Sequence, residues 1–378
     1  MVKNRISVID IGSSKINFNS IKLNNNNYEI DCITEAKYSG FKNGKFVSVN
    51  DLKETIINCY NLLLQNNKQV GRVFVSVPAE FSFCTIKNVE QEFDKLTKIK
   101  ESHLISLHKL IALDEKFLNL TLIDYSSIYF ELDNDLIVEN PLNKKTIKFN
   151  SCISYIFASN KFIKTITEIL NELNIYNITF VSSVMAQNLF LLDEKARENS
   201  STVIDCGAKT TSVSLINKNN LLTLNAFSLG GDYILSDLKS CLNLDDEEAE
   251  FILNQVDLTN KDYLNKFYVV NDKSFSCKIT NNIVLSRIEQ IINSIKQCFL
   301  LYDPSYFDGV KIYLTGGGLT YIKGAVEYLA ELLQKPVYIV KSEIDELKKP
   351  EQSSLYGLVE FAVHYDISKE IIIDKIYE

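Results

Sequence analysis

The stretch ISVIDIGSSKINFNSIKL (residues 6–23) and a second stretch, STVIDCGAKTTSVSLI (residues 201–216), decide the fold of this chain. Each reads as a β-branched strand, then Asp-x-Gly, then a second strand that alternates apolar and polar residues. Asp10 and Asp205 end the two first strands, and a glycine follows each of them two residues later. This pattern predicts a β-hairpin with a polar turn. Because the same hairpin occurs twice, the sequence indicates an internal duplication.

Residues 310–340, VKIYLTGGGLTYIKGAVEYLAELLQKPVYIV, supply a third glycine-containing turn. The apolar run at 310–314 predicts a strand, and three glycines follow it. Apolar residues then recur at helical spacing over Ile322–Leu333, and residues 337–340 predict another strand after Pro336. Strand, turn, helix and strand is the unit of an α/β sheet. Glycines let a ligand approach the backbone, and we expect the following helix to offer free N–H groups to it.

Length, charge and composition exclude several classes of protein. The 378 residues predict two or three domains. A formal net charge of −8 argues against a dedicated nucleic-acid binder. We find no apolar run of the roughly 18 residues that a membrane-spanning helix needs, and no export signal, so the cytoplasm is the expected compartment. The eight cysteines have no metal-binding spacing, and three histidines leave little for nucleophilic catalysis.

Between the two hairpins the chain changes character. An apolar stripe at helical spacing predicts a helix over residues 51–66, and Arg72–Val77 predicts a strand. We interpret residues 80–157 as an inserted subdomain of short strands and one helix, built into the fold without a flexible linker. The elements expected here are a helix at 102–112, strands at 127–132, 145–149 and 155–158, and then a helix at 161–173.

Residues 233–283 are interpreted as a second insertion. An acidic helical stretch lies at its beginning, over residues 245–250, and we expect its charges to form a solvated helix face. Polar strands are expected at 266–271 and 274–279. Towards the C-terminus, residues 354–365 predict the last helix of the body.

The two hairpin turns and the glycine turn together predict a site for a nucleoside triphosphate. Turn backbones offer N–H donors to phosphate oxygens, and Lys15 supplies a positive charge. We expect Asp10 and Asp205 to face each other across a cleft. Two carboxylates beside a triphosphate need a bridging cation, and Mg²⁺ with its bound waters suits oxygen ligands. The hydroxyl groups expected to add donors are those of Ser13, Ser14, Thr210 and Thr211.

With these motifs the chain resembles the actin-like ATPases, and within that group the FtsA family of bacterial cell-division proteins. The segments that carry the resemblance are DIGSSK (10–15), SGFKNGKFVSVNDLKETI (39–56), ENPLNKKTIKF (139–149), MAQNLFLLDEKAREN (185–199), FSLGGDYILSDL (227–238), LSRIEQI (285–291) and LTGGGLTYIKG (314–324). Each segment is degenerate alone, but all seven in this order are specific, and they span nearly the whole chain.

The resemblance implies an α/β, actin-like (ribonuclease H-like) fold with duplicated domains around a nucleotide cleft. It also implies the inserted subdomain that FtsA carries and actin lacks. The implied division is 1–79, 158–200 and 355–378 for the first actin-like domain (subdomain 1A), 80–157 for the inserted subdomain (1C), 201–232 and 284–354 for the second domain (2A), and 233–283 for its small insertion (2B).

The resemblance further implies ATP in the cleft, with Mg²⁺ held by Asp10 and Asp205 mostly through water. Self-association into filaments and tethering of FtsZ to the membrane at the division site are the implied functions. Subdomain 2B is then the site for the C-terminal peptide of FtsZ, and 1C contacts neighbouring subunits and later division proteins. The residues implied to bind ATP are Gly12, Ser13, Ser14, Lys15, Gly207, Lys209, Thr210, Thr211, Gly230, Gly231, Arg287, Glu289, Gly316, Gly317 and Gly318.

The second phosphate turn departs from the family pattern. Family members usually have Asp-x-Gly-Gly-Gly-Thr-x-Asp, whereas this chain has Asp-Cys-Gly-Ala-Lys-Thr-Thr-Ser over residues 205–212. Lys209 either strengthens ATP binding by its charge or obstructs the loop. Residues 181–186 also offer no Glu or Gln to orient an attacking water. We therefore expect nucleotide binding with slow or absent hydrolysis.

The C-terminal segment departs as well, because the family ends in a basic amphipathic helix that lies on the membrane. Residues 366–378, DISKEIIIDKIYE, are more acidic than basic, and a membrane-surface helix needs a basic polar face. We interpret this segment as a packed terminal element and expect membrane contact only peripherally or through a partner. Its apolar stripe consists of Ile367, Ile371, Ile372 and Ile376.

Two alternative functions stay open. A scaffold similar to the pilus-assembly protein PilM shares the inserted subdomain and would bind a membrane-protein tail instead of FtsZ. A small-molecule kinase of the same fold needs a base aimed at a substrate hydroxyl, and the sequence offers no convincing candidate.

Overall fold

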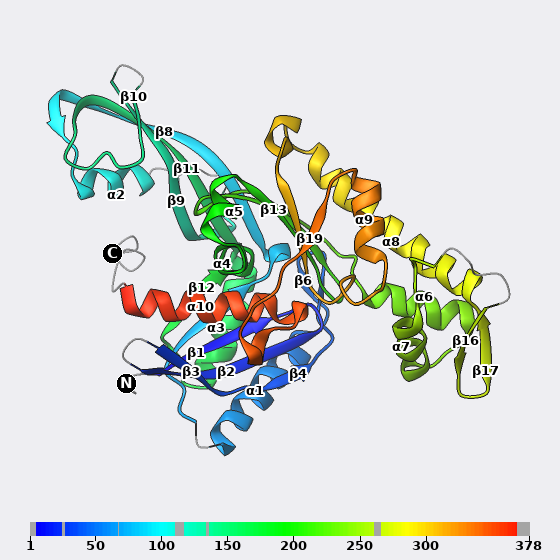
Figure 1. Ribbon diagram of the computed structural model, residues 1–378. Coiled ribbons are helices and arrows are strands. Elements are labelled where there is room, and N and C mark those ends of the chain that lie inside the picture. The colour runs from blue at the N-terminus through cyan, green and yellow to red at the C-terminus, as the bar shows by residue number, and fades with distance from the viewer. Residues whose placement is uncertain are drawn as a thin grey trace.

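Two mixed sheets with the same strand order form the two halves of the chain. The computed structural model, which describes residues 5–24, 27–66, 68–109, 117–133, 136–260 and 266–368, shows both (Figure 1). The first sheet has the order β12-β7-β1-β2-β3, and the second has the order β19-β18-β13-β14-β15. In each, the central strand has an antiparallel hairpin partner on one side and a parallel partner on the other. The predicted duplication is therefore confirmed.

The strands of the first sheet are β1 (Arg5–Ile11), β2 (Lys15–Asn24), β3 (Asn27–Cys32), β7 (Arg72–Val77) and β12 (Ile178–Ser182), with β4 (Glu35–Lys37) paired to β2. Those of the second are β13 (Ser201–Cys206), β14 (Thr211–Asn217), β15 (Asn220–Phe227), β18 (Lys311–Thr315) and β19 (Val337–Ile339). Short elements elsewhere are β5 (Phe41–Lys42), β6 (Lys45–Phe46) and α5 (Glu194–Glu198).

Helices cover both faces of the first sheet, and β1 is apolar on both faces for that reason. Ile9 and Ile11 pack with α1 and α3 on one face, whereas Ile6 and Val8 pack with α10 on the other. A strand that is buried on both faces reads as a nearly continuous apolar run. The helices are α1 (Val49–Gln65), α3 (Asn160–Glu172), α4 (Ser183–Leu191) and α10 (Ser353–Ser368).

A single long helix carries much of the core of the second half. Nine side chains of α8 are buried, and seven of them pack with α6, α9 and the second sheet in one apolar cluster. The buried positions Val284, Ile288, Ile291 and Ile295 recur at helical spacing. The helices are α6 (Asp232–Leu242), α8 (Cys277–Leu300) and α9 (Ala325–Leu333).

The inserted subdomain is a four-stranded sheet, and Figure 1 shows it as an arm that extends away from the first sheet. The elements are β8 (Ser82–Lys98), α2 (Glu101–Lys109), β9 (Leu120–Leu132), β10 (Leu136–Val138) and β11 (Lys145–Ser159). The expectation of short strands is wrong, since β8 and β11 run for 17 and 15 residues. Their outer ends carry cross-strand ion pairs such as Lys148–Glu90. Because these positions are charged, this part of the strands has no apolar run that would indicate a strand in the sequence. Part of the predicted helix at 102–112 lies outside the described residues.

The second insertion consists of α7 (Asp246–Gln255), β16 (Phe267–Val270) and β17 (Lys273–Ser276) beside α6 and the start of α8. The strand predicted at 274–279 ends at Ser276, because Cys277 and Thr280 are buried as part of α8. The acidic stretch is also more than a solvated face. Asp245 and Glu248 form a capping box at the start of α7, and the buried Glu248 pairs with Lys273 at 2.8 Å.

The C-terminal part follows the prediction as far as it is described. The last helix, predicted at 354–365, is observed as α10. Residues 371–378 and the side chain of Ile367 lie outside the described residues, so the apolar stripe of the terminal segment remains a prediction. Among the described helices, none is long and apolar enough to cross a membrane.

Candidate functional site

A cavity of about 600 Å³ lies between the two halves, and both hairpin turns open into it. Three sequence motifs that are far apart in the chain, at residues 10–15, 205–210 and 316–318, meet in its walls. The predicted nucleotide-binding residues found there are Asp10, Gly12, Ser13, Ser14, Lys15, Asp205, Gly207, Thr210, Gly231, Gly316, Gly317 and Gly318.

Asp10 lies at the end of β1 and is buried. Its Oδ1 accepts hydrogen bonds from Ser76 Oγ on β7 at 2.8 Å and from Ser354 Oγ on α10 at 2.7 Å. Ser76 Oγ in turn accepts the N–H of Ile11. Burial raises the pKa of Asp10, while the two hydroxyl donors and Lys15 oppose that rise. The carboxylate is thus held in one orientation by two different elements.

Asp205 occupies the equivalent position at the end of β13. Its Oδ2 accepts a hydrogen bond from Gln187 Nε2 on α4 at 2.9 Å. Desolvation raises the pKa of Asp205 to about 6, and the charge of Asp10 contributes to the rise although Gln187 opposes it. The two carboxylates therefore lie in the walls of one cavity and interact by charge repulsion.

Two nearby carboxylates with raised pKa values suit a cation that is bound partly through water. Among the described residues, no group of three or more His, Cys, Asp and Glu side chains is placed to hold a metal ion. Mg²⁺ usually keeps several waters and takes one or two carboxylates plus phosphate oxygens. Asp10 and Asp205 fit that donor set, and a phosphate chain would have to complete it.

The two hairpin turns have the same backbone geometry. The Gly12 N–H donates to the Lys15 carbonyl at 3.0 Å, and the Gly207 N–H donates to the Thr210 carbonyl at 2.9 Å. The turns also touch each other, because the Lys209 N–H donates to Ser13 Oγ at 3.0 Å. The duplication therefore extends from the strands to the hydrogen bonds inside the turns.

Both lysines of the turns have partners within the protein. Lys15 Nζ lies 2.7 Å from a Glu35 carboxylate oxygen. Lys209 Nζ donates to the Ser39 carbonyl at 2.8 Å, so its side chain crosses from the second half to the first. Lys209 is not among the residues that line the cavity, although its neighbours Ala208 and Thr210 are.

Four other predicted residues lie outside the cavity walls. Thr211 is buried and donates to the Leu229 carbonyl at 2.7 Å, and Gly230 packs against the backbone of the second turn. Arg287 and Glu289 lie on α8. Arg287 pairs with Asp237 of α6, and Glu289 accepts a hydrogen bond from the Tyr328 hydroxyl. The structure therefore does not bring these four residues into the cavity wall.

Residues that the sequence analysis missed form the far wall instead. Glu250, Leu253 and Asn254 of α7 line the cavity together with Tyr321 and Ile322. The spacing of the three α7 residues, at i, i+3 and i+4, places them on one helix face. That spacing was visible in the sequence, but nothing in it distinguished this face from a solvated one.

Gln187 is another residue that the sequence analysis missed. It directly follows the segment 181–186, which offers no water-orienting Glu or Gln. Its side chain is buried and reaches Asp205, so a carboxamide stands beside the second carboxylate. Chain position alone did not indicate this contact.

The third glycine turn is packed against the second phosphate turn. Gly316 has φ of 83°, and a Cβ there would collide with the Cys206 carbonyl and the Asp205 carboxylate. The Gly318 N–H donates to the Cys206 carbonyl at 2.7 Å. The helix that was expected to follow directly, α9, begins only at Ala325, so its free N–H groups do not adjoin these glycines.

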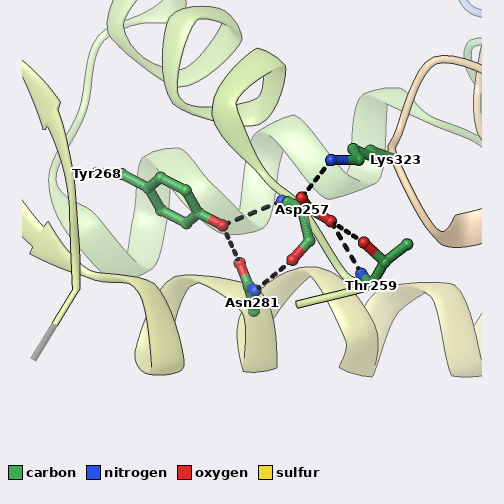
Figure 2. Close-up of polar contacts among 5 residues, drawn as sticks. All are labelled: Asp257, Thr259, Tyr268, Asn281 and Lys323. Carbon is green, nitrogen blue, oxygen red and sulfur yellow. Dashed lines mark hydrogen bonds and ion pairs between the residues drawn. The ribbon is translucent and has the colours of Figure 1, made fainter. Parts of the chain in front are cut away.

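A partly exposed polar network connects the second insertion to the segment that follows this glycine turn (Figure 2). Asp257 Oδ2 accepts from Lys323 Nζ at 2.5 Å, two residues after the cavity-lining Tyr321. The Asp257 N–H donates to the Tyr268 hydroxyl at 3.1 Å, and the Asp257 carbonyl accepts from Asn281 Nδ2 at 3.2 Å. Asp257 thereby joins β16, α8 and Lys323, which follows the cavity-lining Ile322 in the chain.

Comparison with known proteins connects this architecture to two groups. Residues 202–357 match the family model "Cell division protein FtsA". The cell division protein FtsA of Bacillus subtilis (strain 168) is 24% identical over 168 residues, which cover 42% of this chain and 38% of that protein. The match thus spans well under half the length of that relative. The family-model match at 202–357 includes the second phosphate turn, the second insertion and the glycine turn.

Solved structures match over almost the whole chain. The PilM–PilN type IV pilus biogenesis complex aligns with a TM-score of 0.59 and 14% identity, covering 96% of this chain and 99% of that one. MreB5 of Spiroplasma citri bound to ADP aligns with a TM-score of 0.58 and 10% identity, covering 97% and 99%. At such identities the structures establish the fold alone. With its two matching sheets the chain has the actin fold, and over residues 202–357 it is similar to the FtsA family.

Proposed function

We propose that this chain is an ATP-binding cell-division scaffold that self-associates and links FtsZ filaments to the division machinery at the cytoplasmic face of the membrane. The observation that carries the proposal is the cavity with Asp10 and Asp205 on its two sides, lined by both phosphate turns and the glycine turn. The FtsA match over residues 202–357 supports the cell-division role.

ATP would lie with its phosphates between the two hairpin turns and its adenosine against α7 and Tyr321. The turn N–H groups and the hydroxyls of Ser13, Ser14 and Thr210 are donors of the kind that phosphate oxygens accept. Mg²⁺ would be held by Asp10 and Asp205, mostly through water, and it would neutralise phosphate charge. Two structures of MreB5 of Spiroplasma citri are named as bound to ADP and to AMPPNP, which fits this use of the fold.

Calorimetric titration of Mg·ATP into the parent and into Gly317→Val tests the nucleotide site. A Cβ at Gly317 meets only side-chain atoms of Glu351 and Tyr321, both in the cavity wall, with the nearest atom at 3.1 Å. Gly316 and Gly318 are unsuitable, because a side chain there would strike backbone atoms. We expect micromolar binding by the parent and its loss in a variant that melts at the parent temperature. No binding by the parent would refute the ATP assignment.

The second insertion, residues 233–283, is the proposed site for the C-terminal peptide of FtsZ. In β16, Tyr268 and Val270 point inward, while Phe267 and Val269 are 58% and 50% exposed. Phe251 of α7 is 55% exposed and lies close by, since Gln255 Nε2 bonds to the carbonyls of both Phe251 and Val269. Exposed aromatic side chains of this kind commonly anchor a peptide.

Fluorescence anisotropy with a labelled FtsZ C-terminal peptide tests this surface. Phe267→Ser and Phe251→Ser should each weaken binding about tenfold or more, as hot-spot truncations do. Tyr176→Ser, which removes a 71% exposed aromatic side chain from the first half, is the matched control and should bind as the parent does. If the parent ignores this peptide, the FtsZ assignment fails. Binding of a membrane-protein tail instead would favour the PilM-like alternative.

Self-association is proposed to involve the inserted subdomain, residues 80–157, through which later division proteins would also bind. Its apolar side chains Leu96, Leu136, Ile137 and Ile147 are at least half exposed. Sedimentation of the parent with Mg·ATP should show assemblies that Ile137→Asp loses. A monomer at every concentration would refute this part of the proposal.

A further inference from the structure

Residues 39–46, which we call the strap, pass from the first half towards the second at the edge of the cavity. The strap contains β5 and β6 and a turn at Asn43 and Gly44, both with positive φ. Phe41 is buried and its ring stands edge-on to Phe81 at 5.1 Å, while Phe46 stacks on Phe81 at 5.0 Å. The strap is thus anchored in the core of the first half by two aromatic rings.

Lys209 forms the first fastening between the strap and the second half. Its Nζ donates to the Ser39 carbonyl at 2.8 Å, while its backbone N–H donates to Ser13 Oγ at 3.0 Å. Asp51 accepts the Ser39 N–H at 2.6 Å, and the charge of Lys209 helps to lower the pKa of Asp51. A glycine, which the FtsA family usually has in this position, has no side chain that could span the gap.

Ser228 forms the second fastening. Its Oγ accepts the N–H of Asn43 at 2.7 Å and donates to Glu80 Oε1 at 2.6 Å. The other Glu80 oxygen accepts the N–H of Gly44 at 2.9 Å. One hydroxyl from the second half is therefore held between the strap and a carboxylate of the first half, and its bond to that carboxylate is charge-assisted.

Both fastenings lie beside the cavity that the proposed function assigns to ATP. A second cavity of about 280 Å³ is lined by Asn43, Gly44, Glu80 and Ser228, and it shares Ala79 and Ala226 with the main cavity. Between the two fastenings, Lys42 Nζ lies 5.6 Å from the centre of the Tyr233 ring of α6. The contacts of Lys209 and Ser228 and the Lys42–Tyr233 contact each join one half of the chain to the other.

We propose that the strap closes the two halves over the phosphate end of the cavity, fastened by Lys209 and Ser228, and that a bound nucleotide leaves only when both fastenings open. The closure itself does not depend on nucleotide, because all its bonds are between protein groups. The effect on nucleotide release rests on the proposed function. In this proposal Lys209 holds the two halves together and does not bind phosphate.

Hydrogen–deuterium exchange of the nucleotide-free protein tests the closure without relying on ATP. Lys209→Met keeps the aliphatic stem but loses the ammonium, and it is monitored at the Asn43 and Gly44 amides, which belong to the other fastening. Ser228→Ala is monitored at the Lys209 amide. We expect exchange at the remote fastening to accelerate about tenfold in each variant, since losing a hydrogen bond with a charged group makes local opening easier by about that factor.

Two control variants separate closure from general loosening. Lys335→Met removes a lysine-to-carbonyl bond of the same length, 2.8 Å to Phe307, that lies wholly within the second half. Ser240→Ala removes a hydroxyl that bonds only within α6. Both should leave exchange in the strap unchanged. If each test variant changes exchange only at its own fastening, or if the controls loosen the strap equally, the closure proposal is overturned.

Dissociation of a fluorescent ATP analogue tests the second part. The double variant Lys209→Met/Ser228→Ala should release the analogue at least about tenfold faster than the parent and the double control. Equal release rates would overturn the gating of nucleotide release by the strap. If the parent binds no nucleotide, the proposed function fails, whereas the exchange experiment still decides whether the strap holds the halves together.

Discussion

Ser354 Oγ donates a hydrogen bond to Asp10 Oδ1 at 2.7 Å, although 344 positions separate the two residues in the chain. The bond joins the start of the last helix, α10, to the carboxylate at the end of the first strand. The same helix packs closely on α4, because a Cβ at Gly357 would lie 2.6 Å from the backbone of Gln187. Asp10 in the cavity wall and Gln187, which bonds to the second carboxylate Asp205, are thus positioned by α10.

Ser354→Ala should therefore weaken Mg·ATP binding about three- to tenfold. The serine hydroxyl favours the charged form of Asp10, so its removal raises the pKa of that carboxyl further and frees its orientation. Calorimetry at pH 7 measures the change. Ser286→Ala, whose hydroxyl bonds only within α8, is the matched control and should bind as the parent does. Equal affinity in Ser354→Ala and in the parent would contradict a positioning role for this hydroxyl.

The sequence predicted the centre of the fold well, and the reason is local. The two hairpins, the α1 stripe and the strand–turn–helix unit at 310–340 each have a periodicity that only one kind of element satisfies. The inserted subdomain was predicted poorly, because strands such as β8 carry charges that pair across the sheet with residues 58 positions away, for example Glu90 with Lys148. A single-sequence pattern does not contain that partner.

The site was predicted in the same uneven manner. The positions of Asp10, Asp205 and the turn residues follow directly from the hairpins, because the local sequence of each turn determines its geometry. Gln187 and Ser354 reach the carboxylates only through the packing of α4 and α10 on the first sheet. Arg287 was assigned by likeness to a family helix, yet here it pairs with Asp237 and stays out of the cavity. Contacts that depend on tertiary packing have no signature in the spacing of residues.

Asp205→Asn should stabilise the nucleotide-free protein at pH 7. Burial and the charge of Asp10 raise the pKa of Asp205 to about 6, above its ordinary value, so the folded state binds this proton more tightly than the unfolded state does. The contribution is therefore fully present below about pH 4 and is lost as the pH rises through about 6. The variant should be more stable than the parent by roughly 2 kcal/mol at pH 7, somewhat below the full shift because the carboxylate partly faces the open cavity.

Urea unfolding of both proteins between pH 4 and pH 7.5, without Mg²⁺, measures this difference. Taking the difference between parent and variant cancels the other titrating groups. Asparagine keeps an oxygen that accepts the Gln187 hydrogen bond, so the local structure should persist. A difference that is independent of pH would show that Asp205 is not the group responsible. Mg·ATP affinity of the parent should also fall as the pH drops through about 6, since the cation needs the ionised carboxylate.

Gln187→Ala should lower the rate of ATP hydrolysis. The Nε2 of Gln187 is fixed by Asp205, which leaves the carboxamide oxygen as an acceptor that can orient an attacking water. We expect the purified parent to turn over well below about one ATP per second, and Gln187→Ala to be slower by about tenfold or more. Single-turnover measurements with the enzyme in excess give both rates. An unchanged rate in Gln187→Ala would limit this residue to holding Asp205, and turnover of several ATP per second would contradict slow hydrolysis.

Asp257→Asn should loosen the second insertion from the glycine turn while leaving the first half intact. The Asp257 carboxylate accepts from Lys323 Nζ and from both the N–H and the hydroxyl of Thr259, and these donors hold its pKa at about 2. Its stabilising contribution is present above its ordinary pKa and is lost only as the pH falls through about 2, so the variant should differ from the parent across the whole neutral range. We expect a loss of roughly 1–2 kcal/mol, because three charge-assisted bonds weaken together but solvent screens them. Amide exchange around Tyr268 and Asn281, whose side chains bond to the Asp257 backbone, should accelerate.

Asp246→Asn, which breaks an exposed pair with Lys239 in the same insertion, is the control and should change little. Equal effects of the two substitutions would show that the Asp257 network is no more than a surface ion pair.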